Sequence, residues 1–150
     1  MSIPLRLLLI EDSEDDASLV VRTLRRGGYD LTYERVETAE AMRDALARHP
    51  WDLVISDYSM PQFTGPAALG LLHEIGIDLP FIIVSGTIGE ETAVVAMKAG
   101  AHDFLMKGQL TRLIPAVARE LREAADRRER RQADEQRGDE ITSFHFSFSD

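Results

Sequence analysis

Apolar residues occur along this chain in two patterns that alternate with each other. One pattern is a short continuous run rich in Leu, Ile and Val, which is typical of a strand buried on both faces of a parallel sheet. The other places apolar residues three or four positions apart, as on the buried face of a helix. The continuous runs predict strands over 5–10, 51–57, 79–85 and 103–106, and a weaker, more polar strand is expected over 31–36, near an edge of the sheet.

Local signals at the ends of the helical segments support this division. Ser13 and Thr38 are suited to cap the first two helices, and Gly76 follows the third. A fourth helix is expected over 90–99, and a last one begins near Leu110. The strand–helix alternation occurs five times. It predicts an α/β fold with a five-stranded, doubly wound parallel sheet of the flavodoxin-like order 2-1-3-4-5 and helices on both faces.

The chain changes character after the main domain, which we expect over 1–125. Segment 126–138 combines helix-forming residues of both charge signs, so it predicts a charged helical extension or linker that ends at Gly138. In the tail 139–150, Phe144, Phe146 and Phe148 alternate with polar residues, which is a strand pattern. We expect this tail to be a disordered end or a dimerisation arm. In the second case, a homodimer would form through the last helices or the tail.

Composition limits the partners and the compartment. The chain has 26 acidic and 17 basic residues and a net charge of −9, which argues against binding nucleic acid by bulk electrostatics. Its lack of cysteine excludes disulfides and thiolate metal sites and fits a reducing compartment. No signal peptide is apparent, and no apolar run is long enough to span a bilayer. We therefore expect a cytoplasmic protein with no nucleic-acid or membrane partner.

Polar residues follow the carboxyl ends of four buried strands, where ligands gather in open parallel sheets. Because we expect these strands to be neighbours, their end groups should converge. Three carboxylates about 5 Å apart would repel by roughly 3 kcal/mol per pair at an effective dielectric near 20, so they would hold protons or a cation. An all-oxygen set of this kind suits Mg²⁺. The residues at these strand ends are Glu11, Asp12, Asp57, Ser85 and Lys107.

This combination suits phosphoryl transfer to a carboxylate. Asp57 would attack phosphorus and form an acyl phosphate. Mg²⁺ and Lys107 would neutralise the phosphoryl oxygens, and Ser85 would donate a hydrogen bond to one of them. The chain has no glycine-rich phosphate loop, and the acidic stretch after the first strand disfavours a dinucleotide or flavin.

Four motifs in the same order, LLLIED, DLVISD, FIIVSGT and KAGAHDFLMK, give the chain a family resemblance. Over about residues 5 to 125 it resembles the receiver domain of bacterial two-component response regulators. The resemblance implies that Asp57 accepts a phosphoryl group from a phosphohistidine on a sensor histidine kinase or phosphotransfer protein. We expect a conformational switch with no output domain in this chain. The other roles that the resemblance implies are a direct Mg²⁺ ligand (Asp12), a ligand through water (Glu11), a ligand through its backbone carbonyl (Ser59), the lysine (Lys107), and the switch pair (Ser85 and Phe104).

The sequence departs from the family pattern at a few positions. Glu11 stands where Asp is commoner, and Gly108 stands where a proline usually follows the lysine, which leaves the path of that loop open. Phe104 lacks the hydroxyl of a tyrosine and would otherwise be an ordinary core aromatic.

Two other functions remain as alternatives to the receiver. A Mg²⁺-dependent aspartyl-phosphate phosphatase would need a second carboxylate two residues after the nucleophile, where this chain has Ser59. A pseudo-receiver that only binds partners would be expected to lack Asp57, Asp12 or Lys107, and all three are present.

Overall fold

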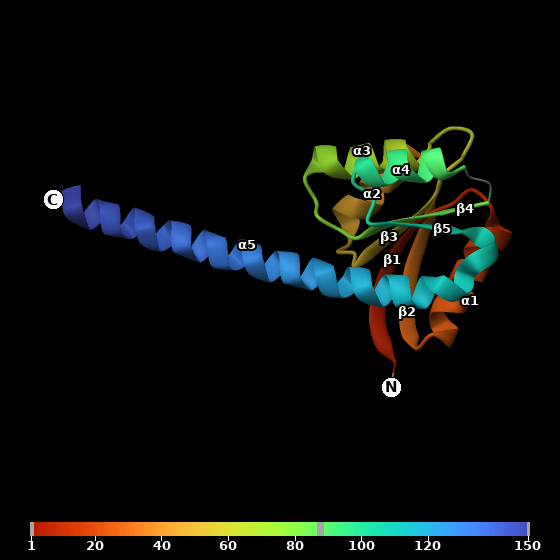
Figure 1. The fold of residues 1–150 in the computed structure, drawn as a ribbon, viewed down its shortest axis with the longest axis horizontal. Coiled ribbons are helices and arrows are strands. Elements are labelled where there is room, and N and C mark those ends of the chain that lie inside the picture. The colour runs from red at the N-terminus through yellow and green to blue at the C-terminus, as the bar shows by residue number, and fades with distance from the viewer. Residues whose placement is uncertain (1, 87–88, 150) are drawn as a thin grey trace.

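The computed structural model describes residues 2–86 and 89–149. Its centre is a five-stranded parallel sheet in the order β2-β1-β3-β4-β5 (Figure 1), which confirms the predicted topology. The sequence pattern placed every strand, although the observed bounds differ by up to two residues at the ends. The strands are β1 (Ile3–Ile10), β2 (Tyr29–Val36), β3 (Leu53–Asp57), β4 (Phe81–Ser85) and β5 (Asp103–Met106).

Helices cover both faces of the sheet, as Figure 1 shows, because successive side chains of a strand point to opposite faces. In β1, Leu7 and Leu9 belong to the core beneath α1 and α5, while Leu8 and Ile10 belong to the core beneath α2, α3 and α4. All four side chains are at most 1% exposed. The helices are α1 (Glu14–Arg26), α2 (Ala39–Arg48), α3 (Gly65–Ile75), α4 (Glu90–Lys98) and α5 (Leu113–Ser149).

Side-chain caps fix the starts of three helices. The hydroxyls of Ser13 and Thr38 accept hydrogen bonds from the backbone three residues ahead, as predicted, and Thr64 does the same for α3. Each such cap stabilises a helix by about 1 kcal/mol. Gly76 ends α3 with a φ of 85°, a left-handed conformation that favours glycine.

Two expected element bounds were wrong for local reasons. The third strand begins at Leu53 because Trp51 donates its indole N–H to the carbonyl of Ala45 in α2, 2.9 Å away. The last helix begins at Leu113 rather than near Leu110. Between it and β5 lies the 3₁₀ helix η1 (Lys107–Arg112), in which Gln109 has non-helical dihedral angles.

The end of the chain differs more strongly from the expectation. The helix does not stop at Gly138, and the tail is not a strand, because α5 continues to Ser149 and projects well beyond the sheet (Figure 1). One glycine inside a helix costs only about 0.5–1 kcal/mol relative to Ala, and a strand needs a partner strand. The side chains of Phe144, Phe146 and Phe148 lie outside the described residues, so the dimerisation arm stays a prediction. None of the described helices combines the length and the apolar character needed to cross a membrane.

Candidate functional site

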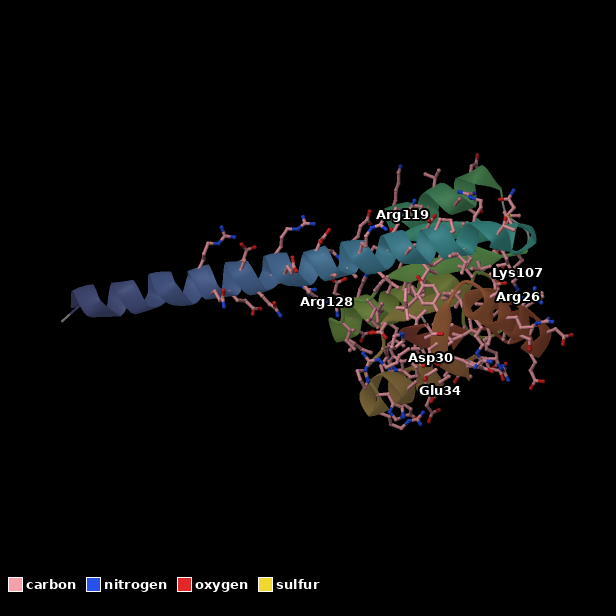
Figure 2. All side chains as sticks on the ribbon, turned by 90° about the horizontal axis from the view of Figure 1, so that it is seen from below. Arg26, Asp30, Glu34, Lys107, Arg119 and Arg128 are labelled. Atoms are coloured by element: carbon pink, nitrogen blue, oxygen red, sulfur yellow. The ribbon has the colours of Figure 1, made fainter. Side chains whose placement is uncertain are left out.

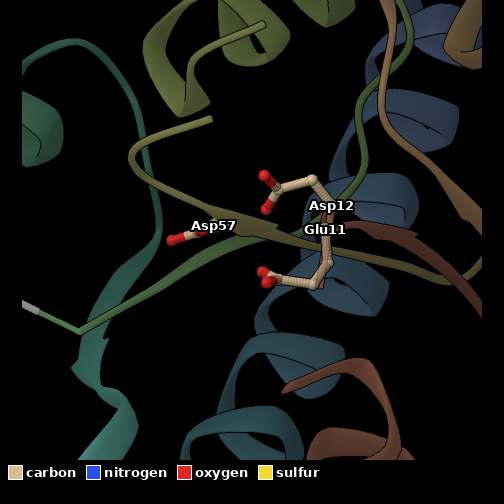
Figure 3. Close-up of side chains that lie close together, drawn as sticks. All are labelled: Glu11, Asp12 and Asp57. Atoms are coloured by element: carbon tan, nitrogen blue, oxygen red, sulfur yellow. The ribbon is translucent and has the colours of Figure 1, made fainter. Parts of the chain in front are cut away.

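The sheet order brings the predicted strand-end residues together at one edge. Glu11 and Asp12 follow β1, and Asp57 ends the neighbouring β3 (Figure 3). Carboxylate oxygens of these three residues lie within 4.8 Å of one another. Glu11 and Asp57 are buried, at 4% and 7% exposure, whereas Asp12 is exposed. Two of the clustered carboxylates are therefore largely shielded from water, and the third opens to solvent.

Backbone contacts hold the loop after β1 in position. The N–H of Glu11 donates to the carbonyl of Val36 at 3.0 Å, which continues the pairing of β1 with β2. On the β2 side, Arg35 donates from Nη1 to the carbonyl oxygen of Glu11 at 3.0 Å. The N–H of Ser13 donates to Oε1 of Glu11 at 3.4 Å, so the side chain folds back over the start of α1. These contacts orient the Glu11 carboxylate toward Asp57.

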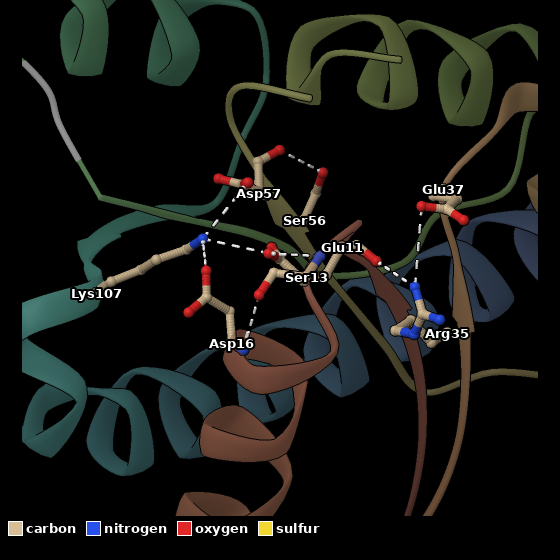
Figure 4. A network of polar contacts seen from close by, with 8 residues as sticks. All are labelled: Glu11, Ser13, Asp16, Arg35, Glu37, Ser56, Asp57 and Lys107. Carbon is tan, nitrogen blue, oxygen red and sulfur yellow. Dashed lines mark hydrogen bonds and ion pairs between the residues drawn. The ribbon is translucent and has the colours of Figure 1, made fainter. Parts of the chain in front are cut away.

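Lys107 is the cation of the site and contacts several carboxylates (Figure 4). It begins η1, directly after β5, and its Nζ lies 3.4 Å from Oδ2 of Asp57 and 3.3 Å from Oε1 of Glu11. Its shortest contact, at 2.6 Å, is with Oδ2 of Asp16. Gly108 is the second residue of η1, so the chain turns into a 3₁₀ helix where the family usually has proline.

Asp16 is a site residue that the sequence reasoning missed. It lies in the first turn of α1, where a carboxylate stabilises the helix N-terminus, and Ser13 accepts a hydrogen bond from its N–H at 3.2 Å. The available signal was helical spacing. Asp16 precedes the buried Val20 and Leu24 by four and eight residues, which places it on the face of α1 that packs on the sheet.

Burial and charge shift the pKa of two groups in the site. Burial, followed by the charge of Asp57, raises the pKa of Glu11 to about 7, although Lys107 opposes this. Burial alone would lower the pKa of Lys107, but the hydrogen bond to Asp16 and the charges of Glu11 and Asp57 outweigh it and raise that pKa. Lys107 is therefore charged throughout the neutral range, while Glu11 is costly to ionise in the metal-free protein.

The predicted switch residues lie on β4, which neighbours the strand of Asp57, and on β5 beyond it. Ser85 ends β4 and is 2% exposed; its neighbour in that strand, Val84, pairs in register with Asp57. Phe104 is half-buried in β5, and its ring centroid is 6.3 Å from that of Tyr58, with the ring planes inclined at 52°. Ser59 is exposed in the loop after β3. Ser85 and Phe104 thus lie on the two strands beyond Asp57.

The backbone of Asp57 depends on a close approach by α3. The N–H of Gly65 donates to the carbonyl of Tyr58 at 2.9 Å. A Cβ at residue 65 would lie 2.9 Å from the carbonyl oxygen of Asp57 and 3.2 Å from the Cα of Tyr58. Glycine is therefore required here by packing, which the sequence reasoning also missed.

Comparison with known proteins gives a consistent result. The family model described as response regulator receiver domain matches residues 7–118. The response regulator protein FleR of Pseudomonas aeruginosa is 36% identical over 115 residues, covering 76% of this chain and 24% of that protein. The transcriptional regulatory protein PrrA of Mycobacterium tuberculosis is 30% identical over 102 residues, covering 68% of this chain and 43% of that protein. The chain thus spans less than half the length of these curated relatives.

Solved structures agree with the sequence matches. A signal receiver domain from Vibrio parahaemolyticus is 30% identical, with a TM-score of 0.72 over 82% of this chain and 94% of that chain. NtrX from Brucella abortus is 27% identical, with a TM-score of 0.75 over 89% of this chain and 30% of that chain. The sheet order, the cluster of strand-end residues and the family match over most of the sequence agree, and the chain belongs to the family of response regulator receiver domains.

Proposed function

We propose that this receiver domain is a phosphorylation-controlled switch in which Asp57 accepts a phosphoryl group from the phosphohistidine of a sensor histidine kinase or phosphotransfer protein. The observation that carries the proposal is the position of Asp57. Its carboxylate ends a buried strand beside Glu11 and Asp12, with the ammonium of Lys107 at 3.4 Å. Carboxylates and a fixed cation at one point supply a nucleophile and a means of stabilising phosphoryl charge.

The carboxylate cluster fits a divalent cation. It offers hard oxygen ligands, and two of the three carboxylates are buried, so their mutual repulsion is poorly screened by water. Mg²⁺ prefers such oxygen ligands and keeps several waters, which suits a site open on the Asp12 side. We propose Asp12 and Asp57 as direct ligands, Glu11 as a ligand through water, and the carbonyl of Ser59 as a further ligand. The bound cation would neutralise charge on the phosphoryl oxygens.

The residues of the chain would then carry the transfer as follows. A carboxylate oxygen of Asp57 forms the new bond to phosphorus, and the bond from phosphorus to the imidazole nitrogen of the donor breaks. Lys107 and the hydroxyl of Ser85 bind phosphoryl oxygens. Attack of water on the acyl phosphate would later release phosphate and regenerate the Asp57 carboxylate, which gives the switch an intrinsic reset.

The switch itself would use the two strands beyond Asp57. When Ser85 binds the phosphoryl group it moves toward Asp57, and the space it leaves is filled by Phe104. Because Phe104 is half-buried beside Tyr58, its inward movement would change the surface around α4 and β5. We place this activity in the cytoplasm, where a histidine kinase presents its phosphohistidine.

The acceptor assignment is tested with a small phosphodonor. The 150-residue chain incubated with phosphoramidate and Mg²⁺ should gain the mass of one phosphoryl group, and Asp57→Asn should abolish the gain because an amide is a poor nucleophile. Asp15→Asn, on the exposed side of α1, is the matched control and should be labelled normally. Undiminished labelling of the Asp57→Asn variant would refute the assignment.

A further inference from the structure

The carboxylate nearest to Lys107 is not the proposed phosphoryl acceptor. The Nζ of Lys107 lies 2.6 Å from Asp16 but 3.4 Å from Asp57 and 3.3 Å from Glu11. Asp16 comes from a different element, the first turn of α1, where the hydroxyl of Ser13 accepts a hydrogen bond from its N–H at 3.2 Å. The cap thus holds the backbone of Asp16 at the start of α1, and the Asp16 carboxylate contacts the ammonium from outside the acidic cluster (Figure 4).

Asp16 also lies closer to solvent than the other carboxylates that contact Lys107. Its side chain is 36% exposed, against 8% for Asp57 and 5% for Glu11, and that of Lys107 is intermediate at 25%. The ion pair with Asp16 thus holds the ammonium at the outer side of the site. Without Asp16, the ammonium would keep Glu11 and Asp57 as its partners among the residues that the structure describes, and those are the oxygens proposed to bind a cation.

We infer that Asp16 is a positioning residue that controls whether the Lys107 ammonium pairs with the acidic cluster or with the phosphoryl group. This inference rests on the proposed function. In the metal-free protein, Asp16 makes the shortest contact with the ammonium, so Lys107 pairs less closely with Glu11 and Asp57 than it would without Asp16. Once Mg²⁺ neutralises these carboxylates, Asp16 becomes a competitor, because it retains the ammonium that the phosphoryl oxygens need.

Removing the Asp16 charge should therefore have two opposite effects. In Asp16→Asn, Lys107 should pair more closely with Glu11 and Asp57, and the affinity for Mg²⁺ should fall by about two- to fivefold. At saturating Mg²⁺, labelling by phosphoramidate should become faster by about two- to fivefold, since Lys107 is free to bind the phosphoryl oxygens. A merely structural defect would lower both quantities together.

The experiment compares Asp16→Asn, Asp16→Glu and the control Asp15→Asn in the full chain. Asp15→Asn removes the same charge from the same helical turn but on its exposed side. Mg²⁺ affinity is measured by calorimetry, labelling by intact mass, and the Lys107 ammonium by its Nζ resonance in metal-free protein. We expect only Asp16→Asn to shift the Lys107 resonance, to lower the affinity for Mg²⁺ and to raise the labelling rate. Asp16→Glu should bring the affinity and the labelling rate back toward wild type.

Two results would overturn the inference. One is a fall of both Mg²⁺ affinity and labelling rate in Asp16→Asn, and the other is behaviour of Asp16→Asn that matches Asp15→Asn. Failure of the proposed function has a different signature, because wild-type protein would then take up no phosphoryl group. The Mg²⁺ titration and the Lys107 resonance would still decide the role of Asp16 in that case.

Discussion

At the scale of single residues, Glu11 links the site to the stability of the fold. Its pKa is raised to about 7 by burial and by Asp57, from an ordinary value of 4.5. The folded protein therefore binds a proton more tightly than the unfolded chain does. In the absence of divalent cations, this residue's contribution to the free energy of unfolding should fall as the pH rises from about 4.5 to about 7. The loss should be about 2–3 kcal/mol.

This pH dependence is measurable by urea unfolding in EDTA at several pH values across that window. Glu11→Gln is the matched control, because the amide keeps the shape and does not titrate. The fall of the free energy of unfolding with pH should be smaller in Glu11→Gln. Mg²⁺ should stabilise the wild-type protein most near pH 7. An equally steep slope in the amide variant would show that Glu11 is not the responsible group.

Gly65 packs too closely against the backbone of Asp57 to accept a side chain. Gly65→Ala would raise helix propensity but would bring Cβ within 2.9 Å of the Asp57 carbonyl oxygen. We expect the steric overlap to outweigh the gain in helix propensity and to lower the free energy of unfolding by about 1–3 kcal/mol. Gly70→Ala is the control within the same helix, since nothing lies within 4 Å of its Cβ position, and it should stabilise by up to about 1 kcal/mol. Chemical unfolding of both variants measures the contrast, and equal effects would contradict it.

At the scale of elements, the sequence was most informative where one local cause decides the outcome. Buried apolar runs identified β1, β3, β4 and β5, a more polar pattern identified β2, and Ser13 and Thr38 identified two helix starts. The bounds that failed depend on the tertiary structure. Trp51 leaves the strand pattern because its indole binds the carbonyl of Ala45 in α2. The helix stop predicted at Gly138 failed because a single glycine is a weak signal inside a strongly helical segment.

In the candidate site, too, some contacts could be predicted from the sequence and others depend on the tertiary structure. Strand-end position was enough to predict that Glu11, Asp12 and Asp57 come together, because sheet order follows from topology. The contact of Asp16 with Lys107 could not be predicted so directly. It depends on where the first turn of α1 lies relative to η1, and these elements are far apart in the chain.

The attachment of α5 to the domain can be tested through Asp78, in the loop before β4. Its Oδ2 accepts from Arg127 at 3.2 Å and from Arg131 at 2.7 Å, and Nη2 of Arg127 is already buried without a hydrogen-bond partner among the described residues. Asp78→Asn should destabilise by about 1–2 kcal/mol, because it removes the negative charge that pairs with the partly buried guanidinium of Arg127.

The control is the exposed pair of Arg137 and Asp134, which lies farther along α5. Asp134→Asn should change the free energy of unfolding by less than about 0.5 kcal/mol. Amide hydrogen exchange along α5 should accelerate in Asp78→Asn and stay near wild type in Asp134→Asn. Unchanged exchange around Arg127 would show that the Asp78 contacts do not hold α5 to the sheet.

At the scale of the whole molecule, α5 leaves the sheet near Arg128 and carries charged side chains around its projecting part (Figure 2). Over 128–138, where its side chains are described, the helix is exposed on all sides. An exposed helix gains little stability from charge pairs, which favours a partner for this segment. Truncation after Arg137 should shift the protein toward monomer in sedimentation velocity if the end of the chain joins two copies. A mass unchanged by truncation would exclude association through the tail.

The proposed switch requires that a phosphoryl group on Asp57 changes the structure beyond its own loop. The most direct measurement is a comparison of backbone amide NMR shifts before and after phosphorylation in Mg²⁺, with Asp57→Asn as the unphosphorylated control. We predict shifts that extend from Asp57 through Ser85 to Phe104 and that are missing in the control. Shifts confined to the loops around Asp57, with Phe104 unchanged, would contradict the switch.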